Sequence, residues 1–333
     1  MKAVYLEEGA VSRGDISLEP ITSIVETKVF DNTTEDDKFE HIGDAEAVFT
    51  NKVIFDEKTF ERLPNLKYVG VCATGYNVID LDAARKRGIV VTNVPAYSTE
   101  SVAQLAWGFI LECAGHISSH NESVHNGDWI KSETFCYWLT PAMELAGKTL
   151  GIVGYGNIGR RMAEIAAAFK MNVKIYTAHP EKYIKDGTAG AERTSDALSD
   201  ASSMSFVSLE ELLSESDIIS LHCPMTKDTD KMINAGSISK MKDGCILINV
   251  SRGGLVDEDA LAAALKSGKL AAAAVDVVSA EPMKEDNPLL TAPNIIITPH
   301  IGWASVEART RLISTIADNF KAFLNGSPVN VVS

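Results

Sequence analysis

Short apolar runs alternate with helical patterns along the whole chain of 333 residues. Several runs are apolar throughout, as expected for strands covered on both faces of a parallel sheet. Ten runs predict strands: KAVYL (2–6), AEAVFT (45–50), LKYVGVCA (66–73), GIVVTNV (88–94), KTLGIVG (148–154), VKIYT (173–177), DIISLHC (217–223), CILINV (245–250), AAAVDVV (272–278) and NIIITPH (294–300). The alternation predicts an α/β fold with right-handed crossovers.

Three helices have clear signals. The segment 157–170 has one apolar face, formed by Ile158, Met162, Ile165, Ala166 and Phe169. Ser208 is expected to cap a second helix, completed by a capping-box Glu211 and a Val207–Leu212 staple. The last helix (308–326) ends at Gly326 and turns inward Leu312, Ile313, Ile316, Phe320 and Phe323. The polar stretch 185–205 predicts a surface excursion or a frayed helix.

Composition narrows the class of protein. The formal charge of -14 argues against binding to nucleic acid or anionic membranes, which requires basic surface. No apolar run suggests a signal peptide or a membrane span. The odd number of scattered cysteines, without a C-x-x-C pair, indicates a reducing, cytoplasmic location. We expect each to pack as a small apolar residue: Cys72, Cys113, Cys136, Cys223 and Cys245.

A glycine-rich turn joins the strand 148–154 to the helix 157–170. Its pattern is G-x-G-x-x-G, with Gly154, Gly156 and Gly159. These glycines permit a tight turn, close approach of a pyrophosphate and close packing of helix on strand. The helix N-terminus then offers unpaired N–H groups to the phosphates. The strand–turn–helix context predicts a dinucleotide site.

The turn after strand 173–177 bears on which dinucleotide binds. An acidic residue here grips the ribose 2′-hydroxyl of NAD, but Thr177, Ala178 and His179 fill the turn and the first acid is Glu181. His179 and Lys182 could attract a 2′-phosphate. Equally, the Thr177 hydroxyl and the backbone could hold NAD. The sequence therefore leaves NAD and NADP both open, with a slight preference for tolerance of NADP.

Polar residues follow three further strands. Arg252 follows the strand 245–250, Asp276 and Glu281 end or follow the strand 272–278, and His300 follows the last strand. The carboxyl ends of parallel strands form the crevice where such sheets bind ligands. A guanidinium suits a carboxylate, and an imidazole beside a carboxylate suits proton exchange near neutral pH. We predict one catalytic group of Arg252, Glu281 and His300.

His116, His120 and His125 lie on one helical pattern without further ligand types, so a polar helix face is expected rather than a metal site.

Taken together, these motifs resemble the D-isomer-specific 2-hydroxyacid dehydrogenases over nearly the whole chain. The segments that carry the resemblance are 65–104, 144–160, 221–234, 246–261, 274–282 and 298–305. CATGYNVIDLDAA, NVPAYSTESVAQ and HIGWAS are most similar to the glycerate dehydrogenase (hydroxypyruvate reductase) group.

The resemblance implies two Rossmann-like domains with parallel sheets and a homodimer. A flavodoxin-like substrate domain would comprise 1–100 and 301–333. The dinucleotide-binding domain would comprise 101–300, with a dimerisation segment near 101–150. The cofactor, NAD or NADP, would contact Asn157, Ile158, Thr177, Cys223, Pro224, Val250, Arg252 and Asp276 in addition to the glycines. The substrate would contact Ala73, Thr74, Gly75, Arg252 and His300.

The expected reaction is hydride transfer between a nicotinamide and a small 2-hydroxy or 2-keto acid. Glycerate, hydroxypyruvate or glyoxylate are the expected substrates. D-lactate dehydrogenase and a non-catalytic, NAD(H)-sensing protein remain alternatives. Formate oxidation is not expected, because Glu281 replaces the glutamine of that branch. Phosphoglycerate oxidation of the long-chain type is not expected either, because no regulatory domain follows in the sequence.

Overall fold

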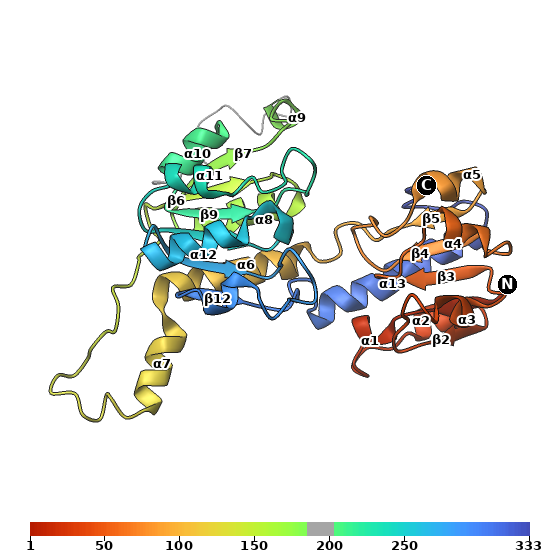
Figure 1. The fold of residues 1–333 in the computed structure, drawn as a ribbon, viewed down its shortest axis with the longest axis horizontal. Coiled ribbons are helices and arrows are strands. Elements are labelled where there is room, and N and C mark those ends of the chain that lie inside the picture. Colours follow the sequence, from red (N-terminus) through yellow and green to blue (C-terminus); the bar gives the residue numbers. More distant parts are fainter. Residues whose placement is uncertain (185–202) are drawn as a thin grey trace. The chain divides into compact units, whose positions relative to one another are not determined.

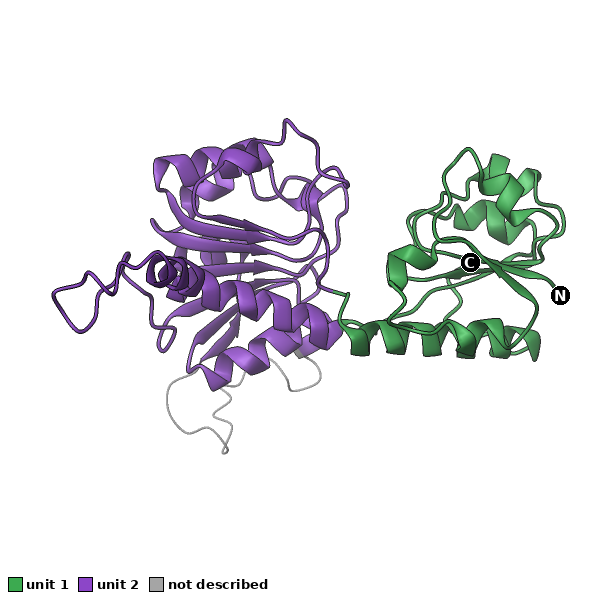
Figure 2. Cartoon of the chain, turned by 90° about the horizontal axis from the view of Figure 1, so that it is seen from below, with its two compact units in different colours: residues 1–98, 303–333 green, residues 99–302 purple. Residues whose placement is uncertain are grey.

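The computed structural model describes residues 1–184 and 203–333. The chain divides into two compact units, one of residues 1–98 and 303–333 and the other of residues 99–302 (Figure 2). Most of the predicted polar excursion, 185–205, lies outside the described residues. Among the described helices, none is both long enough and apolar enough to cross a membrane.

The first unit is a parallel sheet between helices, with the strand order β2-β1-β3-β4-β5 (Figure 1). This is the order of flavodoxin-like sheets. Its strands are β1 (Ala3–Tyr5), β2 (Thr27–Val29), β3 (Ala47–Thr50), β4 (Tyr68–Val71) and β5 (Val90–Thr92). Its helices are α1 (Glu8–Val11), α2 (Glu19–Thr22), α3 (Lys38–Ile42), α4 (Glu57–Glu61), α5 (Leu81–Lys86) and α13 (Val306–Leu324).

The long helix α13 closes one face of this sheet. The Phe320 side chain of α13 is fully buried. Its ring packs edge to face against Phe49 of β3, with the ring centroids 5.1 Å apart. Leu312, Ile313 and Ile316 are buried as predicted. Ser305 accepts a hydrogen bond from the Ala308 N–H and so caps the helix N-terminus. The C-terminal part of the chain therefore completes the core of the N-terminal part.

The second unit holds a seven-stranded parallel sheet in the order β12-β11-β10-β9-β6-β7-β8. Counted within the unit, this is the 3-2-1-4-5-6 order of dinucleotide-binding sheets with one more strand at the edge. The strands are β6 (Thr149–Val153), β7 (Asn172–Tyr176), β8 (Met204–Phe206), β9 (Ile218–Leu221), β10 (Cys245–Asn249), β11 (Leu270–Val275) and β12 (Ile295–Ile297). The chain order reverses between β6 and β9, where such sheets bind ligands.

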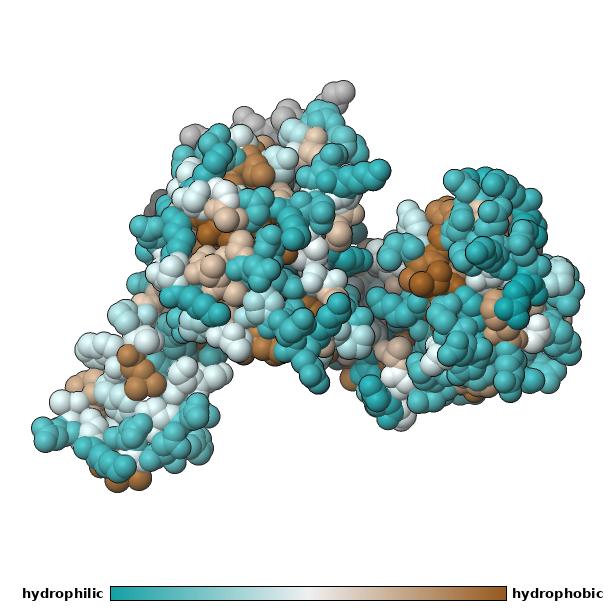
Figure 3. Space-filling model, in the orientation of Figure 1, coloured by the Kyte–Doolittle hydropathy of each residue, from teal (hydrophilic) through white to brown (hydrophobic). Residues whose placement is uncertain are grey.

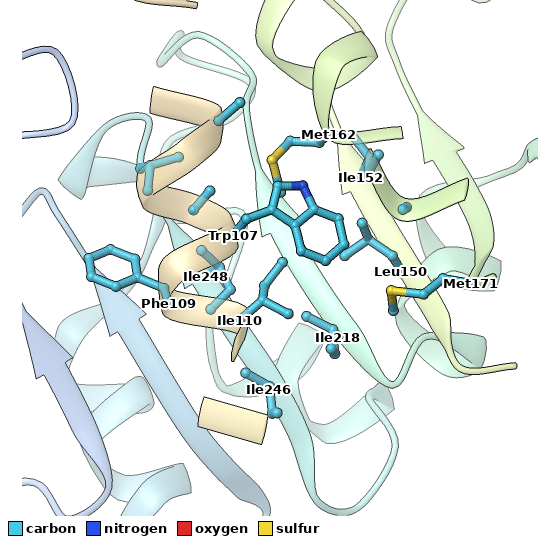
Figure 4. Close-up of a cluster of buried hydrophobic side chains, with 14 of the residues drawn as sticks. Trp107, Phe109, Ile110, Leu150, Ile152, Met162, Met171, Ile218, Ile246 and Ile248 are labelled. Carbon is cyan, nitrogen blue, oxygen red and sulfur yellow. The ribbon is translucent and has the colours of Figure 1, made fainter. Parts of the chain in front are cut away.

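Helices cover both faces of this sheet. The helices of the unit are α6 (Thr99–Gly115), α7 (Ile117–His125), α8 (Asn157–Ala168), α9 (Glu181–Ile184), α10 (Leu209–Glu215), α11 (Ala235–Lys240) and α12 (Glu258–Ser267), with the 3-10 turns η1 (Gly253–Leu255) and η2 (Pro288–Thr291). Of these, α7 projects away from the sheet (Figure 1). Figure 4 shows Trp107 of α6 among side chains of the sheet and of α8. Burial of these large apolar groups, about 1.5–3 kcal/mol each, holds the helices on the sheet.

The predicted fold class, two parallel-sheet α/β domains, is confirmed. All ten predicted strands form. The pattern missed β2 and β8, which are three-residue strands at sheet edges and are not apolar runs. The side chains of both strands are exposed or only partly buried, so their sequences carry a weak signal.

Three local predictions need correction. Ser208 does accept a hydrogen bond from the Glu211 N–H, but the Glu211 carboxylate pairs with Lys174. Phe169 follows the end of α8 and is 36% exposed, although its ring stacks on Trp107. Cys136 is exposed, whereas the other four cysteines are buried as predicted. Short sequence patterns do not report such long-range partners.

Candidate active site

Three loops that carry predicted catalytic residues begin at the carboxyl ends of neighbouring strands in the second sheet. Strands β10, β11 and β12 are adjacent and parallel, with Asn249 paired to Val275 and Val275 to Ile297. Arg252, Asp276 and His300 follow these strands within a few residues. The topology therefore starts all three loops side by side.

Asp276 organises the turn that carries His300. Its carboxylate is 2% exposed and accepts hydrogen bonds from the N–H groups of Ile301 (2.8 Å) and Gly302 (2.7 Å) and from the Thr298 hydroxyl. Its backbone carbonyl also accepts from the His300 N–H at 2.8 Å. A buried carboxylate requires such donors. The turn therefore provides the hydrogen-bond donors that the Asp276 carboxylate requires. The same bonds hold the turn in one conformation.

His300 occupies the left-handed backbone region, with φ of 55°. This conformation costs a residue other than glycine about 1–3 kcal/mol and persists only where the surroundings enforce it. The bonds to Asp276 provide that enforcement.

The imidazole of His300 contacts the carboxylate of Glu281. His300 Nδ1 lies 2.7 Å from Glu281 Oε2, and the two side chains are 30% and 34% exposed. When Nδ1 donates to the carboxylate, Nε2 is the nitrogen that remains for a second proton. The carboxylate thus orients the ring.

Arg252 follows β10, the strand next to β11 in the sheet. Its guanidinium is exposed and donates to the carbonyl of Ser251 at 2.7 Å. The buried Asn249 fixes the backbone beneath it, donating to the Arg252 carbonyl at 2.9 Å and accepting from the Ser251 N–H at 3.1 Å. Sequence reasoning missed Asn249, although a polar residue ending the apolar strand CILIN was a usable signal.

The glycine-rich turn has the geometry expected of a phosphate cradle. At Gly154, φ is 98° and a Cβ would lie 2.6 Å from the Cys223 N. A Cβ on Gly159 would lie 2.1 Å from the Gly154 carbonyl oxygen, so α8 packs directly on the turn. A Cβ on Gly156 would meet nothing within 4 Å. Packing within the protein therefore explains Gly154 and Gly159, whereas Gly156 faces open space, as a ligand's close approach would need.

The N-terminus of α8 adds to this cradle. Its N-cap is Gly156, and no side chain caps the helix in the described part of the chain. Asn157 and Ile158 begin the helix, and the Asn157 side chain accepts from Arg160 at 3.2 Å. Uncapped N–H groups at the positive end of a helix favour an anion. The residues present therefore fit the pyrophosphate of a dinucleotide.

The ends of β9 and β10 line the opposite side of the switch point. Cys223 and Val250 are buried, and the Cys223 carbonyl accepts from the Ser251 hydroxyl at 2.5 Å. Burial raises the pKa of the Cys223 thiol to about 11, so the sulfur stays neutral. Pro224 is exposed, and its carbonyl accepts from the Thr229 hydroxyl at 2.9 Å.

In the turn after β7, Thr177 stands where an acidic residue would bind the ribose of NAD. The Thr177 hydroxyl accepts from the His179 N–H at 3.5 Å. His179 Nδ1 lies 3.2 Å from Glu181 Oε1, and both side chains are largely exposed. The backbone N–H of Glu181, and after it His179, lower the pKa of the Glu181 carboxyl. The first acid of this turn is therefore paired locally.

The predicted substrate loop, Ala73 to Gly75, lies in the first unit after β4. The Thr74 hydroxyl donates to the Val94 carbonyl at 2.9 Å, and the Asn93 amide donates to the Thr74 carbonyl at 2.8 Å. The Val94 N–H donates to the Ala73 carbonyl at 3.0 Å. These bonds use carbonyl and side-chain groups and hold the loop against the segment after β5.

Two of the three histidines on the predicted helical pattern have local side-chain partners. His120 Nδ1 donates to the His116 carbonyl at 2.7 Å, and its Nε2 accepts from the Leu139 N–H at 3.1 Å. His125 Nδ1 donates to the Asn121 carbonyl at 2.8 Å. Among the described residues, no group of three or more His, Cys, Asp or Glu side chains is placed to hold a metal ion.

Comparison with known proteins identifies the family. Residues 107–302 match the model of the D-isomer specific 2-hydroxyacid dehydrogenase, NAD binding domain. A hydroxypyruvate reductase of Blautia hydrogenotrophica is 44% identical, with 100% of both chains covered. A glycerate dehydrogenase of Methylorubrum extorquens is 39% identical over 99% of this chain and 98% of that one. The crystal structure of a D-lactate dehydrogenase of Aquifex aeolicus with NAD and lactic acid has a TM-score of 0.82 at 30% identity, with 100% of both chains covered. The chain belongs to the D-isomer-specific 2-hydroxyacid dehydrogenases, and it is an NAD(P)-dependent oxidoreductase that acts on the CH–OH group of hydroxy acids.

Proposed function

We propose that this enzyme interconverts hydroxypyruvate and D-glycerate, and that it also reduces glyoxylate. The observation that carries the proposal is the contact between His300 Nδ1 and Glu281 Oε2, 2.7 Å apart, at the carboxyl ends of the strands of the dinucleotide-binding sheet. Similarity to relatives named for hydroxypyruvate and glycerate over their full length supports the choice of substrate. D-lactate dehydrogenase activity remains the second candidate, because a solved relative at 30% identity is a D-lactate dehydrogenase.

We assign roles to the residues as follows. Arg252 binds the substrate carboxylate, which leaves the keto carbon in a defined orientation. Gly154, Gly156 and Gly159, with the start of α8, hold the dinucleotide, which supplies the hydride when bound. His300, protonated at Nε2, gives its proton to the keto oxygen as the new C–H bond forms. Glu281 holds the ring and stabilises its positive charge.

His300→Ala tests the acid role. The variant loses the proton donor but leaves the cradle intact, so kcat for hydroxypyruvate should fall by roughly 10²- to 10⁴-fold. The dissociation constant for NADH, measured by fluorescence titration, should be unchanged. Turnover close to that of the parent enzyme would refute the role of His300. Lack of turnover of any 2-keto acid by the parent itself would favour an NAD(H)-sensing protein.

We propose that the enzyme accepts NADPH as well as NADH, because no acid stands at Thr177 and Glu181 is paired with His179. Thr177→Asp tests this. The new carboxylate would repel a 2′-phosphate and bind a 2′-hydroxyl, so the ratio of kcat/KM for NADPH to that for NADH should fall by about tenfold or more, equivalent to about 1.4 kcal/mol.

Thr177→Val is the matched control, since it removes the hydroxyl without adding charge. An unchanged ratio in the aspartate variant would show that the 2′ position is recognised elsewhere.

We also propose that two copies of the chain form a homodimer through an arm, defined as residues 117–144. In Figure 3 hydrophobic side chains lie on the surface of this projecting segment. Ile130, Phe135 and Trp138 are 90%, 89% and 73% exposed. The arm is nevertheless fixed internally, because Trp129 Nε1 donates to the Phe135 carbonyl at 3.0 Å and Ser123 bonds Asp128 at 2.6 Å. An ordered arm that displays large apolar groups is typical of an interface.

The double variant Ile130→Asp with Phe135→Asp should be monomeric in light scattering, whereas the parent should have twice the chain mass. The two apolar side chains contribute roughly 3–6 kcal/mol per chain if fully buried on association. Lys131→Ala with Glu133→Ala, on the same exposed segment, should remain dimeric. A monomeric parent would contradict the proposal.

A further inference from the structure

The loop 278–287, which carries Glu281, is fastened to the first turn of α12 by one carboxylate. Glu258 Oε1 accepts from the Ser279 N–H at 2.7 Å, and Glu258 Oε2 accepts from the Ser279 hydroxyl at 2.8 Å. The same Oε2 accepts from the Asn287 amide at 2.9 Å. Ser279 and Asn287 stand near the two ends of the loop. One side chain on a rigid helix therefore spans the base of the loop.

The start of the loop has a second support, the backbone of η1. A Cβ on Gly253 would lie 1.9 Å from the carbonyl carbon of Val278 and 2.4 Å from the Ser279 N. The Val278–Ser279 peptide thus rests directly on η1, next to Arg252. The Val278 N–H in turn donates to Glu281 Oε1 at 3.3 Å. Glu258 on one side and η1 on the other fix the Val278–Ser279 peptide. The position of Glu281 Oε2, the oxygen that contacts His300, is restricted as a result.

We propose that Glu258 is a positioning residue, which through Ser279 and Asn287 holds Glu281 at bonding distance from His300. The inference rests on the proposed acid role of His300. Glu281 is itself partly exposed, and its loop has polar, exposed residues at Lys284, Glu285 and Asp286. Without the clamp, this loop would share its bonds with water, and the 2.7 Å contact would be populated only part of the time. The hydrogen bonds of Glu258 go to Ser279 and Asn287, so it acts through the loop of Glu281.

Other charges surround the pair and have to be separated from Glu258 in the test. Asp276 lies below the turn, where its carboxylate is bonded to Thr298, Ile301 and Gly302. Arg252 lies beside η1, and Lys284, Glu285 and Asp286 are on the loop itself. Asp259 is the exposed acid next to Glu258 in the first turn of α12. Asp259→Ala removes an equal charge from the same turn and is the matched control.

The experiment compares Glu258→Ala, Glu258→Gln and Asp259→Ala with the parent. The pH dependence of kcat/KM is measured with hydroxypyruvate and NADH. In the reduction direction His300 gives the proton, so a looser contact with Glu281 shifts the pH profile of kcat/KM. Glu258→Ala should show this shift and a loss of kcat of roughly tenfold, well below the 10²-fold that a 1 Å misplacement can cost. Asp259→Ala should match the parent.

Glu258→Gln separates position from charge. The amide oxygen can still accept from the Ser279 N–H, so a positioning role predicts a profile nearer to the parent than to Glu258→Ala. If the two Glu258 variants have the same profile, Glu258 acts by its charge and the proposal fails. The proposal also fails if Glu258→Ala lowers the Tm while its pH profile stays that of the parent. If the alanine variant does not fold, a glutamine variant whose pH profile differs from that of the parent still contradicts the positioning role.

A second readout does not depend on turnover. The His300 ring resonances, followed by NMR on the full chain at a fixed pH, should shift in Glu258→Ala and stay in place in Asp259→Ala. Unmoved resonances would overturn the positioning role. A parent that turns over no 2-keto acid but shows the expected NMR shift would instead refute the proposed function and leave the positioning of Glu281 intact.

Discussion

The site depends on one electrostatic constraint, which is that the buried carboxylate of Asp276 must be hydrogen-bonded. An ionised carboxylate without donors would cost several kcal/mol at such a depth. Its hydrogen-bond donors are the N–H groups of Ile301 and Gly302 and the hydroxyl of Thr298, all in the segment that follows the adjacent strand β12. Satisfying Asp276 therefore shapes the turn, and the turn places His300 in a left-handed conformation that it would not adopt alone.

Similar polar residues at the ends of strands and helices fix the neighbouring loops. Asn249, 1% exposed, holds the backbone at Arg252. Glu258 holds the loop of Glu281. In the first unit Glu7, 6% exposed, accepts from the Thr50 hydroxyl and from the N–H groups of Asn51 and Lys52, and so fixes the turn after β3. In this chain, the backbone segments that carry Arg252, Glu281 and His300 are thus held by hydrogen bonds to Asn249, Glu258 and Asp276.

Much of this organisation could be predicted from the sequence, because the strongest signals are local. Apolar runs located every strand of the sheet interiors, and the spacing of Gly154, Gly156 and Gly159 located the cradle. Placing Arg252, Glu281 and His300 at the ends of strands followed from the topology of parallel sheets. The supporting residues were missed because their partners are distant: 21 positions separate Glu258 from Ser279, and 44 separate Glu7 from Asn51. A polar residue at a strand or helix end shows that some partner is needed, but not which one.

The central claim is that Glu281 contributes to catalysis through His300, and a double-mutant cycle on kcat/KM tests it most directly. Glu281→Gln is measured in the parent and in a His300→Gln background, with hydroxypyruvate and NADH. The account predicts a loss of roughly 10-fold or more in the parent and almost no further loss once His300 is gone, because residues that act as a unit are not additive. An equal loss in both backgrounds would show that the two side chains act independently and would contradict the account.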